Sequence, residues 1–173
     1  MLFRSLHGTM AAAMPTALGL QKAVPGRQVI ALSGDGGIAM LLGDLLTAVQ
    51  ENLPIKVAVY DNGKLGFIDI EQKSEGLLPL YTNLKNPDFG AVAQAMGLWG
   101  RTVANPGELE EAVGTWLSQP GPALLNVKVE SMTLVMPPAI EFGPAYGMAL
   151  YSARAVLGGQ AHDLIDMIQE NFL

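Results

Sequence analysis

Asp35 and Asn62 are the residues whose types and spacing most clearly suggest chemistry. Asp35 lies in a glycine-rich segment, residues 33–37 (SGDGG), and Asn62 follows it by 27 residues. Glycines let a backbone approach a phosphate closely, and the free N–H groups at a helix start can bind it. A carboxylate in such a loop would repel a bare pyrophosphate, whereas a divalent cation between them reverses that interaction. The pattern therefore predicts a metal-bridged phosphate site.

Magnesium is the cation that these donors suit, because it takes about six oxygen ligands from side chains, phosphates and water. Asn62 offers an amide oxygen and Lys64 a backbone carbonyl. The interval from Asp35 is close to one strand–helix–strand unit of about 30 residues, so two neighbouring strand ends would meet at one ion. We expect the side chain of Asp61 to point away from the ion, because successive side chains on a strand alternate. In a bulged loop, Asp61 would compete with Asn62.

Alternating strands and helices must position these side chains. Glycine and proline separate short apolar runs from segments with helical periodicity. Strands are expected at residues 28–32, 55–60, 99–103 and 123–129, and helices at 10–21, 40–52, 67–72, 88–96, 105–118 and from about 145 to the end. This order predicts an α/β fold with a central parallel sheet and helices on both faces. Such sheets bind ligands at the carboxyl ends of their strands, where both motifs fall.

The composition limits the classes of protein that fit. The chain has 173 residues, a net charge of -6, 15% charged residues and no cysteine. The acidic balance argues against a nucleic-acid partner, and the missing cysteines exclude disulfides and zinc–thiolate sites. A charged share below the usual value of about 25% suggests that a homo-oligomer or a neighbouring domain covers part of the surface. No signal peptide or membrane-spanning run is visible, so a cytoplasmic location is expected.

The sequence Gly34-Asp35-Gly36 followed by Asn62 resembles the signature of the thiamine-diphosphate superfamily of pyruvate oxidase, acetolactate synthase and pyruvate decarboxylase. The resemblance covers nearly the whole chain and includes residues 7–10 (HGTM), 28–33 (QVIALS) and 65–67 (LGF). It implies a thiamine-diphosphate- and Mg²⁺-binding domain over residues 1–137, followed by a helical tail over 138–173. This chain has Asp61-Asn62 where the family usually has two asparagines.

The resemblance also implies roles for individual residues. Asp35, Asn62 and the Lys64 carbonyl would ligate magnesium, and the Met10 side chain would wedge between the cofactor's rings. The full set of implied cofactor-binding residues is Gly8, Thr9, Met10, Gly34, Asp35, Gly36, Gly37, Asn62, Lys64, Leu65 and Gly66.

Within the superfamily, residues 66–71 (GFIDIE) and the tail over 149–172 most resemble flavin-containing pyruvate oxidases and quinone-dependent pyruvate dehydrogenases. This finer resemblance implies oxidative decarboxylation of a 2-oxo acid such as pyruvate, with Met10, Phe67 and Glu71 as the catalytic candidates and FAD bound outside this chain. The activating glutamate of the family lies on a separate pyrimidine-binding domain or subunit. The chain is therefore expected to be inactive alone and to be part of a larger enzyme.

Three alternatives stay open. The first is an acetolactate synthase-type carboligase. The second is an NAD-binding Rossmann module, because Gly34-x-Gly36-x-x-Ala39 fits the loose dinucleotide fingerprint, with Asp61 as the ribose-binding acid. The third is a non-catalytic partner subunit that acts through exposed apolar surface.

The tail carries an apolar stripe at helical spacing, formed by Leu164, Ile165, Ile168, Phe172 and Leu173. A helix on a membrane surface usually has lysine or arginine opposite such a stripe, whereas this tail has acidic residues there. Packing on the parent protein is favoured, and peripheral contact with the inner face of the membrane is the alternative.

Overall fold

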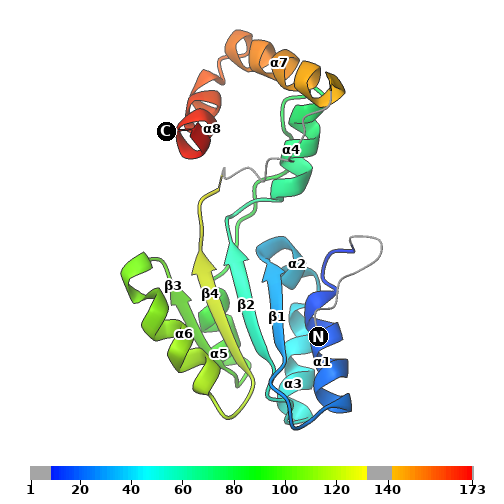
Figure 1. Ribbon diagram of the computed structural model, residues 1–173, viewed down its shortest axis with the longest axis vertical. Helices are drawn as coiled ribbons and strands as arrows, with labels where there is room; N and C mark the ends of the chain where they lie inside the picture. The colour runs from blue at the N-terminus through cyan, green and yellow to red at the C-terminus, as the bar shows by residue number, and fades with distance from the viewer. Residues whose placement is uncertain (1–8, 132–141, 173) are drawn as a thin grey trace. The chain divides into compact units, whose positions relative to one another are not determined.

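The computed structural model describes residues 9–131 and 142–172, which fall into two compact units. Unit 1 comprises the described parts of Met1–Asn62 and Lys85–Val129. Unit 2 comprises those of Gly63–Leu84 and Glu130–Leu173. The predicted boundary between residues 137 and 138 lies outside the described residues and stays a prediction. Figure 1 labels the helices and strands of both units.

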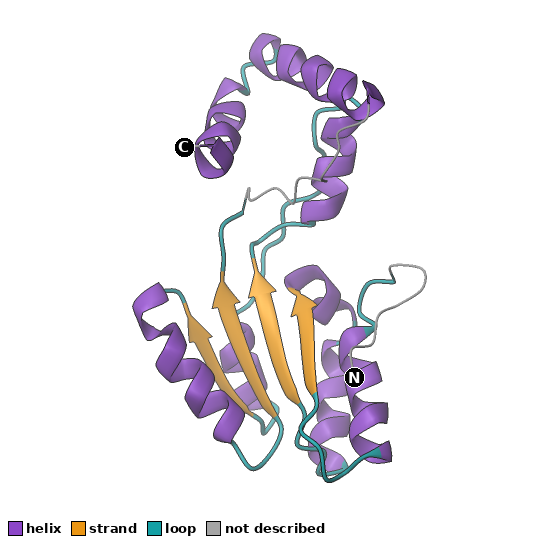
Figure 2. Ribbon diagram, viewed as in Figure 1, coloured by secondary structure: helices purple, strands orange, loops and turns teal. Residues whose placement is uncertain are grey.

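Unit 1 contains a four-stranded sheet in which every neighbouring pair of strands is parallel, in the order β1-β2-β4-β3 (Figure 2). The strands are β1 (Ile30–Gly34), β2 (Lys56–Asp61), β3 (Trp99–Val103) and β4 (Ala123–Lys128). The predicted α/β class with a parallel central sheet is confirmed. The first strand begins and ends two residues later than expected, and the second extends through Asp61. The extension of β2 decides where the side chain of Asp61 lies.

Helices follow the strands of unit 1, although one predicted helix is broken. The helical elements are α1 (Ala13–Ala23), α2 (Asp35–Met40), the 3₁₀ turn η1 (Leu42–Asp44), α3 (Leu45–Gln50), α5 (Phe89–Ala95), the 3₁₀ turn η2 (Pro106–Glu108) and α6 (Leu109–Ser118). The expectation of one helix over residues 40–52 is wrong. Helical backbone begins at once after β1, at Asp35, and is interrupted at Leu41, whose φ of -127° and ψ of 32° lie outside the helical region. Three short pieces replace the single helix.

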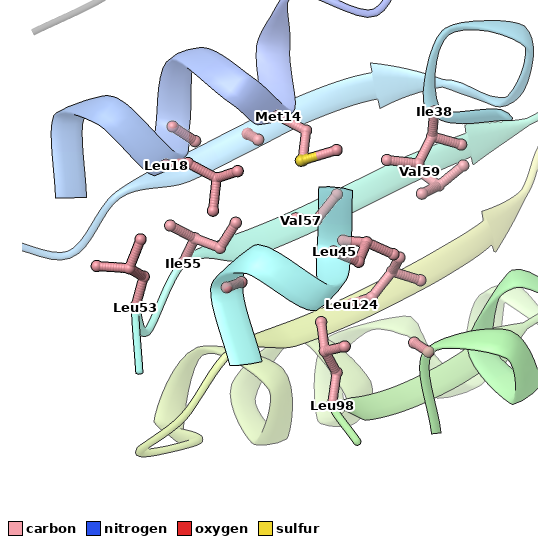
Figure 3. Packing of buried hydrophobic residues seen from close by; sticks show 14 of the residues in the cluster. Met14, Leu18, Ile38, Leu45, Leu53, Ile55, Val57, Val59, Leu98 and Leu124 are labelled. Carbon is pink, nitrogen blue, oxygen red and sulfur yellow. The ribbon is translucent and has the colours of Figure 1, made fainter. Parts of the chain in front are cut away.

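The two faces of the sheet carry separate apolar clusters. Val57 and Val59 of β2 pack with residues of α1, α3 and α5, as Figure 3 shows for part of this cluster. Ala58, which lies between them in the sequence, packs instead with Ala112 and Trp116 of α6. This alternation is the period-two side-chain pattern of a strand buried on both sides. Burying each larger apolar side chain contributes about 1.5–3 kcal/mol.

Unit 2 is built from helices and one short paired segment. Its helices are α4 (Gly66–Ser74), α7 (Phe142–Leu157) and α8 (Ala161–Phe172). The stretch before α4 pairs with a later one, because Leu65 N–H donates to the Thr82 carbonyl and Leu84 N–H donates to the Gly63 carbonyl, each at 2.8 Å. The tail is helical, as expected from about residue 145. The tail forms two helices, α7 and α8, because Gly159 adopts a φ of +76° between them.

The apolar stripe of the tail is partly used for packing. Leu164 and Met167 contact the cluster of Tyr151 and Ala155 on α7, whereas Ile165 and Ile168 are exposed. Within residues 9–131 and 142–172, no helix combines the length and apolar character needed to cross a membrane. The cytoplasmic location and the peripheral membrane contact stay predictions.

Candidate metal and diphosphate site

Asp35 is the first residue of α2 and directly follows the end of β1. It is buried, with 3% of its surface exposed. The N–H of Gly36 donates a hydrogen bond of 2.8 Å to Asp35 Oδ1. The structure therefore holds this carboxylate at the carboxyl end of a parallel strand, where the sequence predicts the ion-binding acid.

A second carboxylate lies beside it. Asp61, the last residue of β2, is also 3% exposed. The side-chain nitrogen of Asn86 donates to Asp35 Oδ2 at 2.6 Å and to Asp61 Oδ1 at 2.9 Å. The Asp61 side chain was expected to point away from the ion, and the structure places it beside Asp35, the proposed ion-binding acid. Because β2 continues through Asp61, its side chain lies on the same face as Val57 and Val59, four and two residues earlier.

The hydrogen bonds continue across the ends of the other two strands. Asp61 Oδ2 accepts from the Lys128 ammonium and from the Asn126 amide, the latter at 3.3 Å. Asn126 also donates to Thr102 Oγ1 at 3.3 Å, and Thr102 donates to Asp88 Oδ1 at 2.5 Å. Asp88 in turn caps α5 by accepting from the N–H of Ala91. One network thus links residues at the carboxyl ends of all four strands; we call it the strand-end network, formed by Asp35, Asn86, Asp61, Lys128, Asn126, Thr102 and Asp88.

The electrostatics of the network keep Asp61 ionised. Burial raises the pKa of Asp61, but hydrogen bonds from Lys128, Asn86 and Asn126 and the charge of Lys128 outweigh it, so the pKa lies below its usual value. Asp88 shows the same direction, because the hydrogen bonds from Thr102 and the N–H of Ala91 lower its pKa. A carboxylate with cationic and amide donors around it is a fixed negative charge at neutral pH.

The glycine-rich loop approaches the segment that begins the described chain. A Cβ at Gly37 would lie 3.1 Å from Ser33 Oγ and 3.4 Å from the Ala11 nitrogen, so any side chain there would crowd both. The backbone after Thr9 and Met10 therefore runs against the loop after β1. Thr9 is exposed and Met10 is 39% exposed. The structure brings these two residues of the predicted cofactor site to the glycine-rich loop. Gly8 lies outside the described residues.

The remaining predicted residues follow β2. Asn62, the last residue of unit 1 before the chain enters unit 2, is half-buried. Lys64, in unit 2, forms a bridge with Asn83, and its ammonium lies 3.6 Å from Asp69 Oδ1. Leu65 directly precedes α4, and Gly66 is the first residue of this helix. Ligation by Asn62 and by the Lys64 carbonyl stays a prediction.

The two catalytic candidates of unit 2 lie on α4. Phe67 is 75% exposed, and Glu71 is exposed as well. Within the described residues, these side chains are open to a partner rather than packed in a core. Their catalytic role, like that of Met10, stays a prediction.

Sequence reasoning missed Asn86, Asn126 and Lys128. Asn126 carried a usable signal, because a buried amide interrupts the apolar strand Ala123–Lys128 and buried amides need partners. Lys128 ends a strand that neighbours β2, which could be recognised only once the strand order was known. Asn86 lies in a loop segment between α4 and α5, and nothing in its sequence context places it near Asp35.

The fold and the site together define a class of protein: a parallel α/β domain that presents an acid-containing glycine loop at its strand ends. Residues 1–127 match the family described as "Thiamine pyrophosphate enzyme, C-terminal TPP binding domain". The chain belongs to this family. This result favours thiamine diphosphate over the dinucleotide that the Gly34-x-Gly36-x-x-Ala39 fingerprint also fitted.

Three relatives are similar to the chain over most of its length. YdaP of Bacillus subtilis (strain 168), whose name describes a thiamine pyrophosphate-containing protein, is 33% identical over 156 residues, covering 90% of this chain and 27% of the relative. The acetolactate synthase isozyme 2 large subunit of Escherichia coli (strain K12) is 34% identical over 132 residues, with 75% and 24% covered. The mitochondrial acetolactate synthase catalytic subunit of Saccharomyces cerevisiae is 36% identical over 132 residues, with 75% and 19% covered. The chain thus spans about a quarter or less of the length of these relatives.

Proposed function

We propose that this chain holds the diphosphate of thiamine diphosphate through Mg²⁺, as the cofactor-binding domain of a larger enzyme that decarboxylates a 2-oxo acid. Asp35, Asn62 and the Lys64 carbonyl are the proposed magnesium ligands. The observation that carries the proposal is the buried carboxylate of Asp35 directly after β1, two residues before Gly37, where a Cβ would lie 3.1 Å from Ser33 Oγ.

The donors in unit 1 fit this cofactor. Carboxylate and amide oxygens are hard ligands of the kind that magnesium prefers, and magnesium usually takes only one or two carboxylates because phosphates complete its shell. Gly36 and Gly37 would lie along the diphosphate, and the backbone around Met10 would hold the aminopyrimidine. When bound, thiamine diphosphate supplies the electron sink for decarboxylation of the 2-oxo acid. The residues of this chain bind and orient it.

The finer activity that we propose is acetolactate synthase-type carboligation. Two of the three relatives described above carry the name acetolactate synthase, which supports this alternative over the oxidase-type activity that the sequence motifs favour. The closeness to pyruvate oxidases and quinone-dependent dehydrogenases has no support from these relatives. A flavin, as the sequence resemblance implies, would be bound by residues outside this chain.

The proposed enzyme needs partners for this domain. A pyrimidine-binding domain or subunit would supply the activating glutamate, and a homo-oligomer would cover exposed apolar surface. This proposal is supported by apolar side chains of β1 and β2 that are between 47% and 56% exposed, namely Ile30, Leu32 and Tyr60. Phe67 on α4 is open to a partner and to substrate in the same way.

Calorimetric titration of the 173-residue chain with thiamine diphosphate tests the cofactor proposal. We expect binding in the presence of Mg²⁺ that is lost when a chelator is added. Asp35→Ala should weaken this binding at least about 100-fold, because even the outer partners of metal ligands contribute about 10–100-fold to affinity. Asp44→Ala, which removes a carboxylate from η1 outside the strand-end network, is the matched control. Equal affinity with and without chelator would refute the metal-bridged site.

The carboligase proposal is tested on the intact enzyme that contains this chain. Incubation with pyruvate and no electron acceptor should give one acetolactate and one carbon dioxide for every two molecules of pyruvate. Acetate formation that depends on an added acceptor would instead support the oxidase reading.

A further inference from the structure

Asn86 connects the carboxylates of two neighbouring strand ends through one atom. Its Nδ2 donates to Asp35 Oδ2 at 2.6 Å and to Asp61 Oδ1 at 2.9 Å. We propose that Asn86 is a positioning residue that holds the Asp35 carboxylate in the orientation needed to ligate the cofactor's cation. The inference rests on the proposed function, because the cation is the magnesium ion assigned there to Asp35.

The geometry around Asp35 supports this role. The Gly36 N–H donates to Oδ1 and Asn86 donates to Oδ2, so the two oxygens have donors from different parts of the chain. Two donors on two oxygens fix the plane of the carboxylate as well as its position. A carboxylate offers about four acceptor directions, and these two bonds use one on each oxygen. The two bonds thus fix the orientation of the carboxylate.

An amide is the chemical group that this position needs. Because Asp35 and Asp61 accept hydrogen bonds from the same nitrogen atom, their carboxylates lie close together. Without a donor between them, the two negative charges would repel each other. A neutral N–H donor lowers that repulsion and adds no positive charge to compete with magnesium. A lysine here would compete with the ion, and an acid would add to the repulsion.

Asn86 is itself anchored by the rest of the strand-end network. Its partner Asp61 is held by Lys128 and Asn126 of β4, and Asn126 is bonded to Thr102 of β3. The position of Asn86 is therefore set by strands on the far side of β2 from Asp35. Partners of this kind, which orient a metal ligand without touching the metal, contribute about 10–100-fold to metal affinity in other proteins.

The experiment uses Mn²⁺ as the paramagnetic probe of the magnesium site. Free Mn²⁺ is followed by electron paramagnetic resonance while the 173-residue chain is titrated in the presence of thiamine diphosphate. We expect Asn86→Ala to weaken Mn²⁺ binding by about 10–100-fold. Asn86→Asp, which keeps the size but replaces the donor with a charge, should weaken it as well. Asn105→Ala is the matched control, because Asn105 also makes a side-chain hydrogen bond in unit 1 but outside the strand-end network.

A second readout separates positioning from a purely structural role. In a nuclear magnetic resonance spectrum of the wild-type chain, the side-chain amide signal of Asn86 should broaden when Mn²⁺ and thiamine diphosphate are added together, and Asn105→Ala should leave that broadening intact. Circular dichroism reports whether each variant is folded. A residue that served only the fold would lower the melting temperature without changing the Mn²⁺ affinity of the folded fraction.

The outcomes are distinct. If the wild-type chain fails to bind Mn²⁺ with thiamine diphosphate, the proposed function fails and the inference falls with it. If wild-type binding is present and both folded Asn86 variants bind within about twofold of it, only the inference is overturned. If neither variant folds while Asn105→Ala does, Asn86 serves the fold, and the positioning role is overturned as well.

Discussion

Asp61 and Lys128 are the last residues of two neighbouring parallel strands, are paired in register and form an ion pair. The carboxylate of Asp61 is buried, with a side-chain exposure of 2%, whereas the lysine side chain is 43% exposed. The partly exposed ammonium of Lys128 therefore compensates the negative charge of the buried Asp61 carboxylate. This relationship explains how the chain accommodates an aspartate beside Asp35.

Asp61→Asn should destabilise unit 1 even though it removes a buried charge. An asparagine can accept from Asn86, but its own N–H₂ group would then face the donors of Lys128 and Asn126. Leaving buried donors unmatched costs about 1–3 kcal/mol. We expect a lower urea midpoint, measured by circular dichroism, with an unchanged slope. Glu111→Gln is the control, because it breaks the exposed pair with Arg101 and should cost less than about 1 kcal/mol. An equal loss in both variants would contradict this account.

Lys73→Met should have the largest effect of any charge substitution in unit 2. Lys73 and Asp69 are one helical turn apart on α4, with an Nζ–Oδ2 distance of 2.6 Å and side chains only 2% and 7% exposed. The lysine also lies 5.4 Å from the centre of the Tyr151 ring on α7. Removing Lys73 leaves the buried Asp69 carboxylate with the more distant Lys64 ammonium, 3.6 Å from its Oδ1, and breaking a buried pair costs about 3–5 kcal/mol.

The matched control is Lys22→Met, which breaks an ion pair of similar length between Lys22 and Glu51 whose side chains are 66% and 53% exposed. We expect that variant to lose less than about 1 kcal/mol. Hydrogen exchange of the α4 and α7 amides measures the stability of unit 2 in Lys73→Met, and that of the α1 and α3 amides measures the stability of unit 1 in Lys22→Met. The double variant Asp69→Asn/Lys73→Met should recover part of the loss, and protection factors that are equal in Lys73→Met and wild type would disprove the prediction.

The sequence was sufficient for the class of fold and for the position of Asp35 directly after the first strand. Short apolar runs predicted β2 and β4, and the glycines around Asp35 predicted a tight turn after β1. Each of these signals depends only on neighbouring residues, so it is visible in the sequence. The position of Asp61 was not, because it depends on whether β2 ends at residue 60 or 61. Had the strand ended at Tyr60, side-chain alternation would not fix the direction of Asp61; because β2 continues through Asp61, that side chain lies on the same face as Val59.

The partners of Asp61 and Asp35 were out of reach for a different reason. Asn86 is 51 residues from Asp35, and Lys128 is 67 residues from Asp61. Both contacts depend on the strand order β1-β2-β4-β3, in which the last strand of the sequence inserts beside the second. No periodicity in one chain reports this order. Similarly, the break of the predicted helix over residues 40–52 at Leu41 is a local backbone event inside a run of leucines.

Asp88→Asn should flatten the dependence of stability on pH at the acid side. Hydrogen bonds from Thr102 and Ala91 lower the pKa of Asp88 in the folded chain. A lowered folded pKa contributes stability above the unfolded pKa of about 3.9, and this stability is lost as the pH falls through the folded pKa. The asparagine keeps the cap acceptor, so its deficit relative to wild type should be present at pH 7 and shrink near pH 3.

Urea midpoints at pH 7 and pH 3 measure this difference, which should stay below about 1 kcal/mol because Asp88 is largely exposed. Asp88→Ala removes the cap acceptor of α5 as well, so its deficit should persist at pH 3. A deficit of Asp88→Asn that grows on acidification would have the wrong sign and reject the assignment.

Gly147→Ala should disrupt the packing of α7 on α4. A Cβ at Gly147 would lie 1.6 Å from the Ser74 carbonyl oxygen and 2.5 Å from the Ser74 carbonyl carbon, which are backbone atoms at the end of α4. Backbone cannot rotate away as a side chain can, so the two helices would have to separate. Overpacking of this kind costs about 1–3 kcal/mol and sometimes more. Gly143→Ala, in the same helix, meets nothing within 4 Å and should be neutral or stabilising by up to about 1 kcal/mol. Hydrogen exchange of the α4 and α7 amides compares the stability of the Gly147→Ala and Gly143→Ala chains. Equal protection in both variants would show that these helices are not in direct contact in solution.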